Sequence, residues 1–213
     1  MAARDYGQYS GITRAVELVG ERWALLIVRD LLVGPRRYGE LAAGLPRIPS
    51  NILAARLKEL QAAGVLRRAP RSRVIVYELT DYGRELEPVV LALGAWGFKA
   101  LGSPREEQVI TPDSMTMDLR SAFLPAVAAA LPPTAYSARA GEASLLLRVD
   151  GPVLEVTRDE GPADLAFAAG QDLHRLISGE LAADRAIETG AVEVLHGRGD
   201  LLGRFTSTFH LAA

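Results

Sequence analysis

The chain has 213 residues, enough for one large domain or two small ones, each with its own hydrophobic core. It is 49% hydrophobic and 23% charged, and no apolar run approaches the ~20 residues that a membrane-spanning helix needs. It contains no cysteine, which excludes disulfides, thiolate catalysis and cysteine metal sites. The first residues lack the layout of a signal peptide, so we expect a cytoplasmic protein.

The net charge of −2 conceals two oppositely charged halves. Residues 1–100 contain 15 Lys and Arg against 10 Asp and Glu, whereas residues 101–213 contain 9 against 16. Within 36–73 there are 9 basic and 2 acidic residues, so the positive charge is local. Such a segment is typical of a surface that binds a polyanion, although a solvated face with its counter-charges elsewhere in the fold would give the same count.

The first hundred residues combine apolar helical stretches with two strands, separated by Gly and Pro. We expect helices at 12–33 (broken near Gly20), 38–45 and 49–63, strands at 65–70 and 74–80 joined by a basic turn, and a helix at 81–101. In this order, several helices are followed by a strand, a wing, a second strand and a final helix. This is the order of a winged helix-turn-helix module. We therefore predict a winged helix-turn-helix DNA-binding and dimerisation domain at 1–101.

A segment rich in Gly, Pro and charge predicts a linker at 102–112, followed by a second domain at 113–213. In this domain we expect a strand at 114–120, where residue types alternate, a helix at 123–131, strands at 135–141, 144–151, 153–159 and 164–169, helices at 171–179 and 182–190, a strand at 191–197 and a helix at 200–211. The predicted fold class is therefore α+β, and the second domain has a mainly antiparallel sheet.

The helix predicted at 49–63 has two dissimilar faces. At 100° per residue, one narrow face carries Leu53, Leu57 and Leu60. The opposite face is small and alanine-rich, with Asn51, Ala54, Ala55 and Lys58. Such a face can approach a major groove closely, where Asn pairs with adenine and Lys reaches guanine or phosphate. Arg56 lies on the flank, where it either reaches a phosphate or pairs internally with a carboxylate such as Glu40 or Asp30.

Further arginines surround this helix. Arg36 and Arg37 precede the short helix at 38–45, and Arg71 and Arg73 bracket Ser72 at the tip of the predicted hairpin. A wing tip reaches the DNA backbone or a minor groove. The adjacent pair at 67–68 must face opposite sides of a strand and cannot both contact one surface. Each arginine alone is more simply solvated; it is their joint placement that favours DNA binding.

Four motifs within residues 10–97 resemble the HxlR family of bacterial winged-helix transcriptional regulators. They are G-x-R-W, G-P-R-R-Y-x-E-L, I-x-x-N-I-L-x-x-R-L-x-x-L and Y-x-L-T-x-x-G-x-x-L. The resemblance implies homodimers that bind pseudo-palindromic operators and associate through their N-terminal and post-wing helices. It also implies DNA contacts from the helix at 50–62 and the wing at 71–73.

Two positions depart from the family pattern. Many members carry a cysteine at the start of the first helix, where this chain has Ser10 nearby and no cysteine at all, so thiol sensing is excluded. A serine usually caps the recognition helix, whereas here Pro49 occupies that place and Ser50 follows as a potential phosphate contact.

The second half resembles the end of a sterol-carrier-protein-like domain over about 113–211. The matching positions are Leu173, Leu176, Gly179, Ala186, Gly190 and Phe205. The resemblance implies an apolar pocket for a lipid, a sterol or a polyketide-like molecule; the alternative is a packed domain that serves dimerisation. The candidate lining residues, each of which could equally be plain core, are Met115, Met117, Phe167, Leu176, Phe205 and Phe209.

No catalytic, metal or cofactor site is expected. The three histidines, His174, His196 and His210, lack metal-ligand spacing, and no G-x-S-x-G motif is present. The sequence thus predicts a transcriptional regulator, most simply a repressor, whose partners are double-stranded DNA, a second copy of itself and a hydrophobic effector. The alternatives are a lipid or polyketide carrier whose winged helix mediates protein contacts, and an enzyme that uses the apolar pocket.

Overall fold

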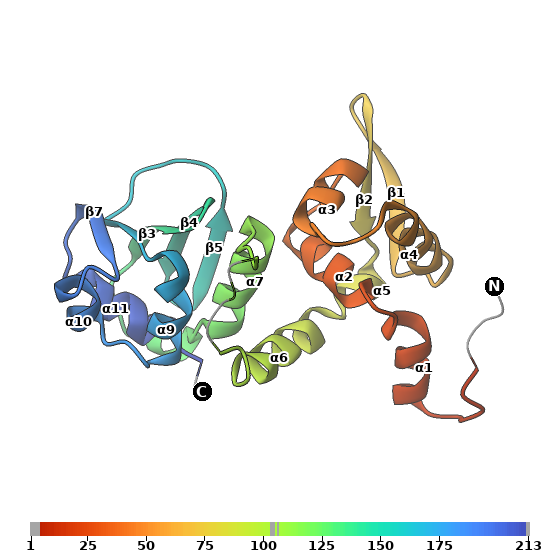
Figure 1. Cartoon of the computed structure of the whole chain (residues 1–213), viewed down its shortest axis with the longest axis horizontal. Coiled ribbons are helices and arrows are strands. Elements are labelled where there is room, and N and C mark those ends of the chain that lie inside the picture. The colour runs from red at the N-terminus through yellow and green to blue at the C-terminus, as the bar shows by residue number, and fades with distance from the viewer. Residues whose placement is uncertain (1–4, 103–104, 106, 212–213) are drawn as a thin grey trace. The chain divides into compact units, whose positions relative to one another are not determined.

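The computed structural model describes residues 5–102, 105 and 107–211 (Figure 1). Its chain divides into two compact units, Met1–Val90 and Leu91–Ala213. The division falls inside one helix, upstream of the predicted linker at 102–112, three residues of which lie outside the described part. The domain limits inferred from sequence stay predictions. Within the described ranges, no helix is long and apolar enough to cross a membrane.

The first unit contains the helices predicted up to residue 63 and the predicted hairpin, followed by a short helix. Its elements are α1 (Gly11–Val19), α2 (Ala24–Val33), α3 (Tyr38–Gly44), α4 (Ser50–Ala62), β1 (Leu66–Arg71), β2 (Val74–Leu79) and α5 (Asp81–Arg84). The antiparallel hairpin β1–β2 projects past α3 and α4 as a wing (Figure 1). The buried face of α4 carries Leu53, Leu57 and Leu60, and the helix contacts α1 and β1, which fixes the outward direction of its other face.

The T-x-x-G motif joins the wing to α5. The Thr80 hydroxyl accepts a hydrogen bond from the Gly83 amide at 3.1 Å and donates one to the Gly64 carbonyl at 2.6 Å. A Cβ at Gly83 would lie 2.0 Å from the Val65 carbonyl oxygen, so only glycine fits there. The motif therefore anchors the start of α5 against the residues that precede β1.

The single helix predicted at 81–101 is wrong. It is two helices, α5 and α6 (Glu87–Phe98), separated at residues 85–86. Pro88 has no amide hydrogen and its ring excludes the carbonyl four residues earlier, so proline is tolerated only in the first turn of the second helix. No residue of α6 is buried, although the helix is strongly apolar.

The second unit is a five-stranded sheet with helices packed against it. Its elements are α7 (Pro112–Ala122), α8 (Pro125–Ala128), β3 (Thr134–Ala140), β4 (Ala143–Asp150), β5 (Val153–Thr157), β6 (Leu165–Ala168), the 3-10 turn η1 (Gly170–Asp172), α9 (Leu173–Ser178), α10 (Ala183–Glu188), β7 (Glu193–Gly197) and α11 (Leu201–Thr208). The strand order is β5-β4-β3-β6-β7, and only the β3–β6 pairing is parallel. The predicted α+β class with a mainly antiparallel sheet is confirmed.

The strand predicted at 114–120 is wrong, since these residues form most of α7. Thr111 and Ser114 cap the helix reciprocally, with amide-to-hydroxyl distances of 3.0 and 3.2 Å, and Pro112 occupies its first turn. Met115 and Leu119, four residues apart, both face the core. The residues that alternate in sequence thus belong to a helix. This helix has a reciprocal N-terminal cap, and its apolar stripe faces the core.

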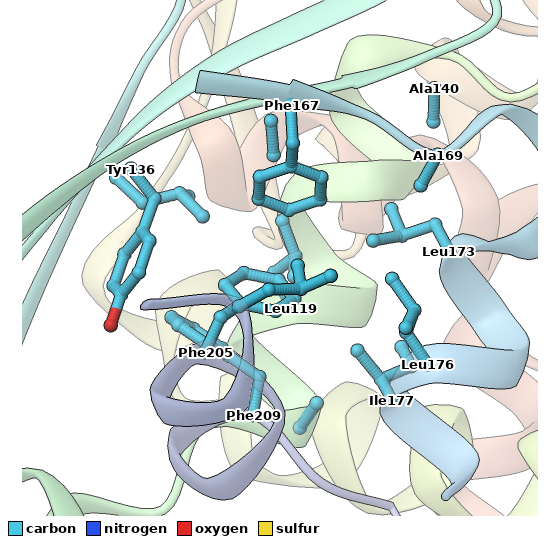
Figure 2. Close-up of a cluster of buried hydrophobic side chains, with 14 of the residues drawn as sticks. Leu119, Tyr136, Ala140, Phe167, Ala169, Leu173, Leu176, Ile177, Phe205 and Phe209 are labelled. Carbon is cyan, nitrogen blue, oxygen red and sulfur yellow. The ribbon is translucent and has the colours of Figure 1, made fainter. Parts of the chain in front are cut away.

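The core of the second unit lies between one face of the sheet and α7, α9, α10 and α11. Figure 2 shows Phe167 from β6 lying above the two aromatic rings of α11 and its end. The Phe167 and Phe205 ring centroids are 5.0 Å apart, and those of Phe205 and Phe209 are 4.8 Å apart. Burial beside these rings raises the pKa of the Tyr136 hydroxyl to about 12.

Candidate nucleic-acid interface

Helix α4 exposes the side that the sequence predicts. Leu53, Leu57 and Leu60 are at most 2% exposed, which fixes the rotation of the helix. The residues on or beside its outer face are Ser50, Asn51, Ala54 and Lys58, which are exposed, and Ala55, which is partly buried. Within the described part of the chain, the Lys58 ammonium has no ion-pair partner. The face therefore presents an amide and an unpaired cation between small side chains.

The start of α4 is held without a side-chain cap. Pro49 is the N-cap residue, and its carbonyl accepts hydrogen bonds from the amides of Ile52 and Leu53 at 3.0 and 2.9 Å. The Tyr38 hydroxyl donates a hydrogen bond to the Ser50 carbonyl at 2.8 Å. The first turns of α3 and α4 are thereby tied together, and the side chain of Ser50 is exposed and forms no hydrogen bond with another described residue.

The sequence left two roles open for Arg56, a phosphate contact and an internal ion pair. The structure shows the internal ion pair. Its side chain is 14% exposed, its Nη2 lies 3.2 Å from Glu21 Oε2, and its Nη1 pairs with Glu59. The partner carboxylates suggested from sequence are used elsewhere: Glu40 accepts from the backbone amide at the start of α3, and Asp30 pairs with Arg29. Two carboxylates thus pair with the Arg56 guanidinium, and the DNA contact suggested for Arg56 stays a prediction.

The arginines of the wing differ in whether a carboxylate pairs with them. Arg67 and Arg71 share a face and bind the two oxygens of Glu78, Nε to Oε1 at 2.8 Å and Nη2 to Oε2 at 2.9 Å. The guanidinium of Arg71 and then that of Arg67 hold the pKa of Glu78 below its usual range. The Arg68 guanidinium lies on the other face, 6.0 Å from the centre of the Tyr77 ring. This confirms that the adjacent arginines point to opposite sides.

The wing tip carries the second kind of cation. Ser72 has a left-handed φ of 55° in the turn, and Arg73 follows it with an exposed side chain. Among the residues placed in the structure, none pairs with the Arg73 guanidinium. Arg73 is thus available to an outside anion, whereas Arg71 already has a carboxylate partner.

Arg36 and Arg37 connect the wing to α3. Arg36 forms a short antiparallel bridge with Tyr77 of β2, with amide-to-carbonyl distances of 3.0 and 2.7 Å. The backbone amide of Arg37 donates a hydrogen bond to Glu40 Oε2 at 2.6 Å, which caps α3, and the Arg37 side chain is exposed. Sequence reasoning missed the bridge and the bracing role of Glu78, although the Arg67–Glu78 pairing follows from the hairpin register.

The residues predicted to line an effector pocket belong to one buried core cluster, with the exception of Met117. Phe167, Leu176, Phe205 and Phe209 are packed in the core. Met115 lines a cavity of about 190 Å³ on the side of α7 that faces α9, and Met117 is buried outside that cavity. Over the described ranges no group of three His, Asp or Glu is placed to hold a metal ion.

Residues 18–104 match the family model described as HxlR-like helix-turn-helix. Over 86 residues the chain is 41% identical to YvaP of Bacillus subtilis (strain 168), named as an HTH-type transcriptional regulator; the match covers 39% of this chain and 80% of YvaP. The chain belongs to the HxlR-like helix-turn-helix family. The winged unit described above therefore has transcriptional regulators as its relatives.

Two other known proteins match a similar length of this chain. The chain is 43% identical over 96 residues to the HTH-type transcriptional regulator Rv3095 of Mycobacterium tuberculosis (strain ATCC 25618 / H37Rv), with 44% of this chain and 60% of that relative covered. It thus matches less than two thirds of the length of its mycobacterial relatives. The solved structure of the HTH-type transcriptional regulator YtcD is 34% identical, with a TM-score of 0.41 and coverage of 44% of this chain and 98% of that one.

Proposed function

We propose that this protein is a DNA-binding transcriptional regulator, most simply a repressor, that binds a pseudo-palindromic operator as a homodimer. The observation that carries this proposal is the outer face of α4, where Asn51 and an unpaired Lys58 lie exposed between alanines. A helix that only packed on a core would present long charged residues to water on this side.

The docking follows from these exposed groups. With α4 in a major groove, the Asn51 amide pairs with an adenine and Lys58 reaches guanine or phosphate. The wing then lies over the neighbouring backbone with Arg73 at its tip. Two copies must place their α4 helices about one turn of DNA apart, ~34 Å, to occupy both half-sites.

The uncovered apolar side chains of α1 and α6 support the homodimer. On α1, Ile12 is 80% exposed, and on α6 the stripe of Val89, Leu93 and Trp96 is 49%, 44% and 73% exposed. Helices that bury so little of their apolar surface within their own chain require a partner. The family resemblance assigns dimerisation to these same two helices, so we assign their faces to a second copy.

The signal that controls binding is proposed to be non-covalent. The sequence has no cysteine, so no thiol can sense an oxidant or electrophile. The second unit has an apolar cavity, and a small hydrophobic molecule bound there is the simplest effector.

Selection of genomic duplexes by the purified full chain, followed by fluorescence anisotropy on the enriched sequence, tests the proposal. Asn51→Ala should reduce the ratio of specific to random-sequence affinity, because it removes a base contact worth ~1–3 kcal/mol. Lys58→Ala should also weaken binding, to every duplex alike where Lys58 contacts phosphate and more strongly to the enriched sequence where it contacts guanine. Arg139→Ala, at an exposed arginine of β3, is the matched control. No enrichment, or unchanged affinities for both α4 variants, would overturn the proposal.

A further inference from the structure

The cavity of the second unit has an apolar wall with a few polar groups at its rim. It lies where the end of α6 and the segment before α7 meet α7 and α9, and it has a volume of about 190 Å³. Its wall includes Phe98, Ile110, Met115, Leu119, Leu173 and Ile177. All of these side chains belong to one compact unit, so the cavity is built without a second copy of the chain.

The size of the cavity limits what can bind. Drug-sized ligands occupy pockets of roughly 300–1,000 Å³, and a cavity of roughly 150 Å³ lined by Leu, Ile and Phe takes up benzene. A volume of about 190 Å³ therefore suits one ring with a short substituent. The sterol or long-chain lipid suggested by the sequence resemblance is too large for this cavity.

The polar groups at the rim specify the chemistry of the ligand. His174 Nδ1 lies 2.5 Å from the carbonyl oxygen of Gln171. Since a carbonyl can only accept, Nδ1 carries the hydrogen in the neutral ring, and Nε2 is left as an acceptor. The Ser114 hydroxyl is already committed to the Thr111 carbonyl at 3.0 Å. The side-chain amides of Gln108 and Gln171 also line the cavity, but among the described residues neither forms a hydrogen bond to His174, so Nε2 can accept one from a ligand.

The described residues that line the cavity include no lysine or arginine. Asp118 is the charged side chain that lines the cavity, and it is exposed at the mouth. An anionic ligand such as a fatty acid would therefore find no cationic side chain in the lining, and burying its charge beside the apolar wall would be costly. A neutral molecule with an apolar ring and one hydroxyl group satisfies both the wall and the histidine.

We propose that this cavity binds a neutral, compact amphipathic molecule of the alkylphenol class, its hydroxyl donating a hydrogen bond to His174 Nε2. We further assign it as the effector site, and this second step rests on the regulator function proposed above. Phe98, which lines the cavity, is the last residue of α6, the helix whose exposed stripe we assign to the homodimer. A ligand there contacts the end of the helix that joins the two units along the chain.

Binding is tested on the full chain labelled with ¹³C at the methionine methyl groups. The sequence has three methionines, and of these Met115 lines the cavity while Met117 is buried outside it. Titration with 4-propylphenol should shift the Met115 signal in a saturable way and move the Met117 signal far less. No saturable shift, or an equal shift of both signals, would overturn the proposed site.

The hydroxyl contact is tested by pairing a protein change with a ligand change. His174→Phe keeps an aromatic ring but removes the acceptor, so the affinity for 4-propylphenol measured by calorimetry should fall roughly five-fold, the effect of one neutral hydrogen bond. The affinity for propylbenzene, which lacks the hydroxyl, should stay within a factor of two or rise. His196→Phe, at an exposed histidine of β7 outside the cavity, should match the wild type for both ligands. Equal losses for the two ligands would refute the histidine contact.

The effector role is tested separately from binding and from DNA recognition. The affinity for the enriched duplex should change at least five-fold in 4-propylphenol for the wild type and less for His174→Phe, since allosteric coupling is typically 5–150-fold. A phenol that binds without changing duplex affinity would refute the effector role. A chain that binds the phenol but no duplex would instead refute the regulator function, and the NMR result would still judge the cavity.

Discussion

The cations of the wing should contribute unequally to DNA binding, because Glu78 occupies some of them and not others. Arg67 and Arg71 share that carboxylate, so the three groups together carry a charge of +1. Arg73 at the tip is exposed and its guanidinium has no partner elsewhere in the described chain. Arg73→Ala should therefore remove a full phosphate contact from each wing.

The expected size follows from counterion release. Each lost phosphate contact reduces the slope of log K against log salt by about 0.9, so a homodimer with two wings loses about 1.8. When the salt concentration rises from about 50 to about 200 mM, both proteins lose affinity for DNA. The loss for Arg73→Ala should be roughly twelve-fold smaller than the loss for the wild type. Glu78→Gln should act in the opposite direction, because it releases the charge of Arg71 and Arg67 and steepens the slope.

Fluorescence anisotropy on one operator duplex, repeated over a salt series, measures these slopes. Arg139→Ala removes an exposed arginine from the second unit and should leave the slope unchanged. If Arg73→Ala had the slope of this control, the wing would not touch the DNA backbone and the docking would be wrong. If Glu78→Gln left the slope unchanged, the two bound arginines would lie away from the duplex.

Four further outcomes are expected. Gly83→Ala should destabilise the fold by about 3 kcal/mol or more in urea unfolding, because the new Cβ would lie 2.0 Å from a carbonyl oxygen, whereas the helical control Gly39→Ala has no atom within 4 Å to meet. Arg56→Ala should cost about 1–3 kcal/mol by the same measurement, less than for a fully buried pair, since its two carboxylates are partly exposed. Trp96→Ser should lower the molar mass measured by light scattering towards that of the monomer. Because its arginine partners lower the pKa of Glu78, its ion pairs stabilise the fold at neutral pH and lose that effect as the pH falls through the lowered pKa, so the Glu78→Gln destabilisation should shrink between about pH 7 and about pH 3.

The elements of the winged unit up to the hairpin could be predicted from sequence because they are marked locally, whereas the break after α5 was missed. Gly20 separates α1 from α2, Pro49 starts α4, and the apolar positions of α4 recur at helical spacing. At α7 two local signals conflict. Residues 114–120 alternate like a strand, but the Thr111 cap and the proline after it decide for a helix.

The site was less predictable because its ion pairs join distant segments. Arg56 meets Glu21, which lies 35 residues earlier in the turn between α1 and α2, and no local pattern selects that carboxylate over Glu40 or Asp30. The position of the cavity depends in the same way on packing, because α9 and the end of α6 enclose it from far apart in the chain. Residue type alone could identify an apolar set but could not separate Met115, which lines the cavity, from Phe205, which fills the core.

The proposed control requires a ligand that prefers one placement of α6 over another, because tight binding alone shifts no equilibrium. A compact phenol meets α6 at Phe98, so its differential affinity is limited to the part of the cavity wall that this end of the helix supplies. A difference of about 1 kcal/mol, one hydrogen bond or a few buried methylene groups, gives roughly a five-fold change in operator affinity. A stronger response would need α6 to move far enough to change the burial of Trp96 as well. A Trp23→Phe variant, in which Trp96 is the remaining tryptophan, would report that movement as a shift of its emission on addition of 4-propylphenol.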